Sequence, residues 1–157
     1  MTETAQVTGR RKPRFNSFDE VLDDVRSLAA QPTRQLGNWS LGQVCQHLGL
    51  AMEHSATTDR LFRVPLWLRV LGRLVRNRAL KHGLPTGFKL PPEGAAKFVP
   101  PPVSIEQGLA TLEKGIAVLS QTSHRAPHPV LGALNVDQWH QFHLRHAEMH
   151  LSFIVPD

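Results

Sequence analysis

The chain has 157 residues, with 18 lysines and arginines against 13 acidic residues, a formal charge of +5 and a single cysteine. This length is enough for one domain to bury a core without disulfides or a structural metal, so we expect any bound metal to be functional. Cys45 alone excludes an internal disulfide, and the polar, basic N-terminal stretch does not resemble a signal peptide. We therefore expect a soluble, cytoplasmic protein.

Four helix starts are visible in the pattern of capping residues. A Ser or Asn is followed three residues later by Glu or Gln, ahead of apolar residues at helical spacing. The four pairs are Ser17 with Glu20, Ser40 with Gln43, Ser104 with Gln107, and Asn135 with Gln138. We expect residues 1–14 to form a flexible basic arm and residues 15–157 to form a single domain. Its first helix is expected over 18–30 and its second after Ser40.

The next segment, residues 61–81, is predicted to be an additional, basic helix. Leu66, Val70, Leu74 and Leu80 fall near helical spacing, and arginines at 69, 73 and 76 lie largely on another side. One interpretation is a helix that binds a membrane surface or nucleic acid. The other, which we favour, is a helix whose arginines form a solvated face, because no stacking aromatics or nucleic-acid motif accompany them.

Residues 83–103 contain so many prolines and glycines that we expect neither a regular helix nor a central strand there. The segment is predicted to be a long crossover, because the helices on either side are too few to close a core alone. A third core helix follows over about 105–120 and a last one over about 136–154. No strand-like alternation appears, so the sequence predicts an all-α fold, a four-helix bundle with one long connection between its second and third core helices.

The last predicted helix carries four of the nine histidines on one stripe. At about 100° per residue, His140, His143, His146 and His150 occupy roughly a third of the helix circumference. His146 and His150 have the i, i+4 spacing that lets two imidazoles bind one metal ion. Ala147 leaves room beside them.

A third imidazole is expected from the second helix, where His47 lies on an apolar face and an unpaired ring would be costly to bury. Three histidines without a fourth protein ligand describe an open, catalytic type of metal site. Each histidine taken alone fits a hydrogen-bonded core residue at least as well, and only the combination favours a metal site. His54 lies seven residues after His47 on nearly the same face, and Cys45 is expected to be a buried structural thiol.

The stretches NWSLGQVCQHLG (residues 38–49) and HLRHAEMHL (residues 143–151) resemble the signature of the DinB/YfiT-like metalloenzyme superfamily. In that superfamily a histidine follows a Trp-Ser or Trp-Thr helix start, and an HxxxH pair lies on the last helix. An uncharacterised branch is more similar still. It has His-Pro, a short apolar turn and Gly before the final helix, as in residues 128–132, and then Trp, Phe-His and further histidines, as at Trp139, Phe142 and His143.

The resemblance implies a right-handed, up-down-down-up bundle that binds a divalent ion, zinc or nickel, through His47, His146 and His150. It also implies a small-molecule substrate, with relatives that include thiol S-transferases using low-molecular-weight thiols, an isomerase and hydrolases. His143, and after it His54, are the candidates for proton transfer or substrate orientation. Two alternatives stay open: a metal-binding module without catalysis, and a basic module for anionic lipid or nucleic acid. A homodimer is compatible with each.

Overall fold

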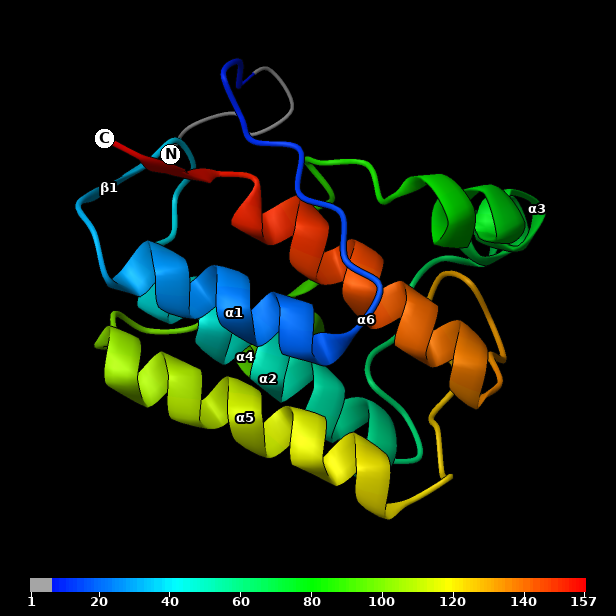
Figure 1. Cartoon of the computed structure of the whole chain (residues 1–157). Helices are drawn as coiled ribbons and strands as arrows, with labels where there is room; N and C mark the ends of the chain where they lie inside the picture. The colour runs from blue at the N-terminus through cyan, green and yellow to red at the C-terminus, as the bar shows by residue number, and fades with distance from the viewer. Residues whose placement is uncertain (1–6) are drawn as a thin grey trace.

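In the computed structural model, which describes residues 7–157, the chain is mostly helical, with six helices and one two-stranded sheet among those residues. Four helices start where the capping pairs predict: α1 (Phe18–Ala29), α2 (Leu41–Thr57), α5 (Ile105–Gln121) and α6 (Val136–Leu151) (Figure 1). In each, the side chain of the cap residue accepts a hydrogen bond from the backbone N–H three residues later. The local capping chemistry therefore sets these starts.

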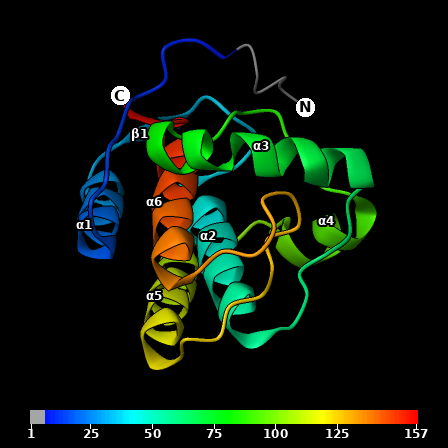
Figure 2. The ribbon, with the colours of Figure 1, turned by 90° about the vertical axis from the view of Figure 1, so that its right-hand side faces the viewer.

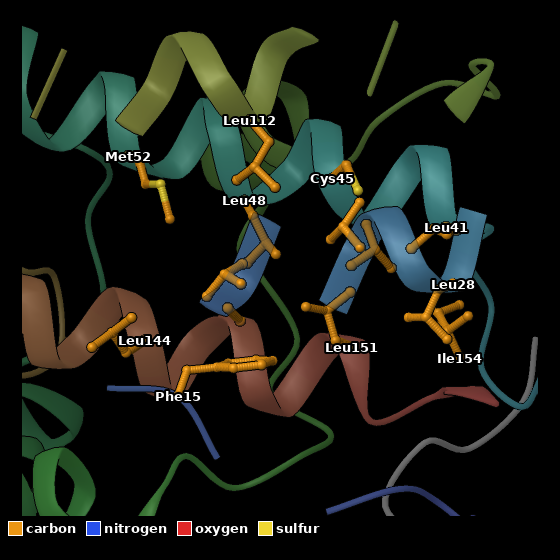
Figure 3. Packing of buried hydrophobic residues seen from close by; sticks show 14 of the residues in the cluster. Phe15, Leu28, Leu41, Cys45, Leu48, Met52, Leu112, Leu144, Leu151 and Ile154 are labelled. Carbon is orange, nitrogen blue, oxygen red and sulfur yellow. The ribbon is translucent and has the colours of Figure 1, made fainter. Parts of the chain in front are cut away.

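The main hydrophobic core takes buried side chains from these four helices, and Figure 3 shows its packing. α2 and α5 lie so close that a Cβ added at Gly42 or Gly49 would overlap the backbone of residues 103–104 or 111–112, respectively. Gly108 and Gly115 are in the same position on α5, against Gly42 and Gly49. Glycine is required there because any side chain would separate the two helices. The close contact holds α2, which carries His47, in place.

The basic segment forms α3 (Leu66–His82), which runs across the view in Figure 2 while α1, α2, α5 and α6 run down it. α3 packs through Gly72, Ala79 and Leu80, which are buried, and Gly72 lies against Val130 of the loop before α6. Leu66, Val70 and Leu74 are exposed instead. The predicted solvated arginine face is present, since Arg69 and Arg73 are exposed, but most of the apolar side chains of the helix are exposed as well. Periodicity separates two faces of a helix without saying which one meets the protein.

The Pro-rich crossover contains a short helix that the sequence analysis did not predict, α4 (Pro92–Phe98). Proline is tolerated at the start of a helix, where its missing N–H would have no partner. Phe98, at the end of α4, is buried in a second, smaller hydrophobic cluster with Leu61, Leu80, Trp139 and Phe142. The crossover is therefore packed against the helices at this point.

A two-stranded antiparallel sheet corrects the all-α expectation. β1 (Thr33–Gln35) pairs with β2 (Ile154–Pro156), so α6 ends at Leu151 and not at Ile154 as predicted. Strands of three residues are too short to show an alternating pattern, and both Ile154 and Val155 are buried. Only the pairing of two segments far apart in the sequence makes them strands.

The basic segment at the N-terminus was expected to be a flexible arm over residues 1–14. Residues 1–6 lie outside the described residues, whereas Arg11 makes two 2.7 Å hydrogen bonds to Asp24 and one of 2.8 Å to the Ile154 carbonyl. The Phe15 N–H donates to Glu148 on α6 at 2.7 Å. These contacts tie residues 11–15 to α1, α6 and β2. Across residues 7–157, none of the helices combines the length and apolar character needed to cross a bilayer.

Candidate metal centre

Two helices that start at complete capping boxes carry the candidate ligands. Ser40 and Gln43 begin α2, which holds His47, and Asn135 and Gln138 begin α6, which holds His146 and His150. The i, i+4 spacing places the two α6 rings one above the other on the side that faces α2. Residues 99 positions apart in the sequence thereby meet in one cluster.

The three imidazoles lie close enough to hold one ion, since one ring nitrogen from each lies within 4.8 Å of the other two. The His146 Nε2 atom lies 3.2 Å from His47 Nε2 and 3.1 Å from His150 Nε2. Ligand nitrogens about 2.0 to 2.1 Å from a zinc ion stand roughly 2.9 to 3.4 Å apart, for octahedral or tetrahedral geometry. The nitrogen spacing therefore fits a shared ion without rearrangement of these two contacts.

The hydrogen-bond pattern points to the same conclusion. His47 Nδ1 lies 2.7 Å from the Phe98 carbonyl oxygen, which can only accept, so Nδ1 carries the proton and Nε2 of the neutral ring is a bare lone pair. If His146 Nε2 carries a proton, it can donate to one neighbour only. If His146 Nε2 carries no proton, its lone pair faces the lone pair of His47 Nε2. In neither tautomer are both contacts satisfied, and a cation would satisfy both.

All three rings are poised in the neutral form that metals bind. Burial, partly offset by the bond to Phe98, lowers the pKa of His47 to about 4. Burial also holds the pKa values of His146 and His150 well below the ordinary histidine value, and the neighbouring imidazoles lower them further. The ligand group contains no carboxylate or thiolate among the described residues. Neutral imidazoles of this kind suit zinc, nickel and similar divalent ions.

Aromatic rings enclose the three histidines. Trp39 stacks on His150 with ring centroids 5.3 Å apart and also contacts His47 at 4.8 Å, while Phe142 lies 5.4 Å from His146. Such rings fix the imidazoles and lower the local dielectric constant. The sequence analysis missed Trp39 and the Phe98 carbonyl as parts of the site. The signal for Trp39 was its place directly before the Ser40 cap, whereas a backbone carbonyl in an irregular crossover leaves no sequence signal.

His143, the first candidate for proton transfer, lies away from the ligand rings. It is buried, stacks on Trp139 at 5.1 Å and has Nε2 3.0 Å from the hydroxyl of Ser55, which itself donates to the Met52 carbonyl. Burial, with Arg125 and two further histidines nearby, holds its pKa well below the ordinary value. Its Nδ1 atom is buried without a hydrogen-bond partner within residues 7–157.

The remaining candidates are separate from the three ligands. His54 is partly buried and meets the ring of Phe98 edge-on at 5.4 Å. His140 meets Phe18 edge-on at 5.5 Å. Cys45 lies in the main core, outside the three-histidine group, and burial raises the pKa of its thiol to about 12. Glu53 forms an ion pair of 2.8 Å with Lys114.

Comparison with known proteins gives a family and no closer relative. The searches of curated proteins and of solved structures yield no match. A family model does match, over residues 7–157, which is nearly the whole chain and includes every candidate ligand. The chain therefore belongs to the family described as "Protein of unknown function (DUF1569)".

Proposed function

We propose that His47, His146 and His150 hold a divalent metal ion and that the protein is a metal-dependent enzyme of the thiol S-transferase or hydrolase type. The observation that carries the proposal is the pair of contacts around His146 Nε2, which no arrangement of protons satisfies and a cation does. Zinc and nickel are the ions of choice, because three neutral imidazoles without a carboxylate make a borderline-soft ligand set.

The number of ligands supports a catalytic type of site. Three protein ligands leave coordination positions open, as in catalytic and unlike structural zinc sites. When bound, such an ion supplies Lewis acidity that lowers the pKa of a coordinated water or low-molecular-weight thiol. His146 and His150 keep partial exposure to solvent, which favours access for a small-molecule substrate. The resemblance of the two histidine segments to the DinB/YfiT-like superfamily, with its up-down-down-up four-helix bundle, supports the same class.

The chain's own residues have distinct roles in this proposal. The Phe98 carbonyl fixes the His47 tautomer so that Nε2 would be available to a bound ion, and Trp39 and Phe142 hold the rings in place. His143, linked to Ser55, is the proposed proton-accepting group, because its Nδ1 has no hydrogen-bond partner within residues 7–157. His54 is the second candidate, for contact with a substrate that approaches along the Phe98 side.

Elemental analysis of protein prepared without a histidine tag tests metal binding. Wild-type protein reconstituted with zinc or nickel and then desalted should hold about one ion per chain. His146→Ala and His150→Ala should hold almost none. His82→Ala is the matched control, because His82 is exposed on α3, and it should bind as the wild type does. Substoichiometric metal in the wild type, or equal metal in His146→Ala, would refute the site.

Catalysis needs a separate test. Metal-loaded protein should consume a low-molecular-weight thiol with an electrophilic probe, or hydrolyse an activated ester or amide, and His146→Ala should lose this turnover. His143→Gln should lower turnover while keeping the bound metal. Metal binding without turnover on either substrate class would favour the alternative, a metal-binding module without catalysis.

A further inference from the structure

Over residues 66–75, the side of α3 that faces away from the protein is apolar. Leu66, Trp67 and Leu74 are exposed by 71%, 66% and 78%, and the neighbouring apolar residues are more than two-fifths exposed. We call this set the α3 outer face: Leu66, Trp67, Val70, Leu71, Leu74 and Val75. At about 100° per residue, all six fall on one half of the helix circumference. The exposure of these six side chains shows that the face is turned outward, and α3 lies at the edge of the molecule in Figures 1 and 2.

A contiguous exposed face of this kind marks an interaction surface. It is not required for the fold, because α3 already packs against the protein through Gly72, Ala79 and Leu80. Leaving large apolar side chains in water gives up the free energy that their burial would supply. The α3 outer face is therefore a surface that some partner covers, and its charged surroundings indicate which partner.

Every charged side chain in residues 60–92 is basic, namely Arg60, Arg63, Arg69, Arg73, Arg76, Arg78, Lys81 and Lys89. The whole chain has 18 basic and 13 acidic residues, so the part outside this segment has ten basic against thirteen acidic residues. The positive charge of the protein is thus concentrated around α3. A surface that combines this charge with an apolar face calls for a partner that is both anionic and apolar.

The arginines are placed to contact anions at the border of the apolar face. Arg69 and Arg73 lie beside Leu66 and Val70 on the helix circumference. Together with Arg60 and Arg63, they line a cavity of about 630 Å³. The cavity lies between α3 and the loop at residues 127–133, and Asp59 is its only acidic lining residue among those described. Arg78 and Lys81 are exposed near the other end of α3.

We propose that α3 docks on an anionic lipid bilayer, lying parallel to the surface with its outer face in the headgroup and acyl-chain boundary. Trp67 and the leucines meet the apolar layer, and the arginines meet lipid phosphates, as in interfacial amphipathic helices. A second copy of this chain, packed face to face, would bring two copies of the basic segment 60–92 together, and their like charges would repel. Nucleic acid would leave the apolar face uncovered. An anionic bilayer matches both features.

Vesicle binding at physiological salt tests the proposal. The protein should sediment with vesicles of equal parts phosphatidylcholine and phosphatidylglycerol, and bind vesicles of phosphatidylcholine alone at least about tenfold more weakly. Leu74→Asp should weaken binding tenfold or more. The double variant Arg69→Gln, Arg73→Gln should weaken it about 30-fold, from roughly 1 kcal/mol per cation near the surface. Ala110→Asp makes a similar charge change at an exposed position on α5 and should bind as the wild type does.

Tryptophan fluorescence adds a direct measure of insertion. Trp139 is buried and Trp39 is packed on the histidines, so the signal lost in Trp67→Phe belongs to Trp67. Brominated lipids should quench that signal. Soluble glycerophosphoglycerol, which is the headgroup without acyl chains, should not displace the protein. Unchanged metal content in the Leu74→Asp variant would show that it is folded, independently of its membrane binding.

Three results would overturn the proposal. The first is equal binding to neutral and anionic vesicles, or binding to neither. The second is a dimer in sedimentation velocity that Leu74→Asp dissociates, which would assign the face to a second copy. The third is tight binding of duplex DNA at physiological salt that Leu74→Asp leaves unchanged, which would assign the arginines to nucleic acid.

Discussion

α6 turns polar rings toward the protein interior, whereas α3 turns apolar side chains toward solvent. On α6, His143 is buried and His146 and His150 are partly buried, and on α3 Leu74 is 78% exposed. Each arrangement costs free energy, the first through desolvation of polar groups and the second through hydration of apolar surface. Departures from the amphipathic pattern concentrate at functional surfaces. The two helices therefore carry two separate surfaces, the proposed metal site inside and the proposed docking face outside.

The largest expected effect on the free energy of unfolding concerns the inward-facing imidazoles of His47, His146 and His150. Zinc at about 100 times its dissociation constant should raise the free energy of unfolding of the wild type by about 2.7 kcal/mol, because only the folded chain assembles the three ligands. His146→Leu should gain nothing from zinc. Urea denaturation with zinc or with a chelator measures both. An equal gain in unfolding free energy in the variant would show that the inward-facing imidazoles are structural. The contrast between α6 and α3 would then no longer hold.

A second effect concerns the loop that supports α3. His128 Nδ1 accepts hydrogen bonds from the N–H groups of Val130 and Leu131, and burial lowers the pKa of His128 to about 3. The unfolded chain, with a histidine pKa of about 6.5, binds more protons between these values, so stability is complete above about pH 6.5 and falls as the pH falls toward 3. At pH 5 the loss from His128 should be about 2 kcal/mol relative to neutral pH.

Denaturation at pH 7 and pH 5 measures this effect. His128→Asn offers a side-chain oxygen as a substitute acceptor and does not titrate, so it should reduce the difference between the two pH values. The same difference in the variant would assign the acid sensitivity to the other buried histidines.

The inner face of α3 should tolerate little change. A Cβ at Gly72 would overlap Val130, so Gly72→Ala should destabilise the protein by about 1 to 3 kcal/mol despite the better helix propensity of alanine. Thermal and urea unfolding measure the change. A neutral or stabilising result would mean that the packing of α3 does not depend on this contact. α3 could then detach from the rest of the domain.

The outer face should give the smallest effect. Leu74→Ala removes an exposed side chain and keeps a strong helix former, so the free energy of unfolding should stay within about 0.5 kcal/mol of the wild type. The same unfolding curves measure it, beside Gly72→Ala. A loss above about 2 kcal/mol would show that the outer face is already covered in solution by another copy.

The parts of the fold that depend on local chemistry could be predicted from the sequence. The starts of α1, α2, α5 and α6 follow from side chains that bind backbone groups three residues away, and such contacts need no knowledge of the tertiary structure. The β1–β2 pairing could not be predicted, because it joins Gln35 to Ile154 across most of the chain. α4 was missed because its prolines lie at the helix start, where they do not break it.

The candidate site likewise has parts that could be predicted from the sequence and parts that could not. The i, i+4 spacing of His146 and His150 on one helix, with His47 on an apolar face of another, was sufficient to predict that the three lie near one another. The Phe98 carbonyl was beyond sequence analysis, since every residue has a carbonyl and only the fold selects one. The orientation of α3 was also beyond it, because Gly72 and Val130 make the decisive contact across the molecule.

The separation of His47 from His146 in the chain has a consequence for synthesis. Domains fold as the chain emerges from the ribosome, and a nascent chain that ends before α6 carries His47 but lacks the other two imidazoles. The hydrogen bonds of Arg11 to Ile154 and of Phe15 to Glu148 likewise form only after these C-terminal partners have been made. The three-histidine cluster is therefore assembled only once α6 has been made and has docked, so an ion that needs all three ligands binds only after that step.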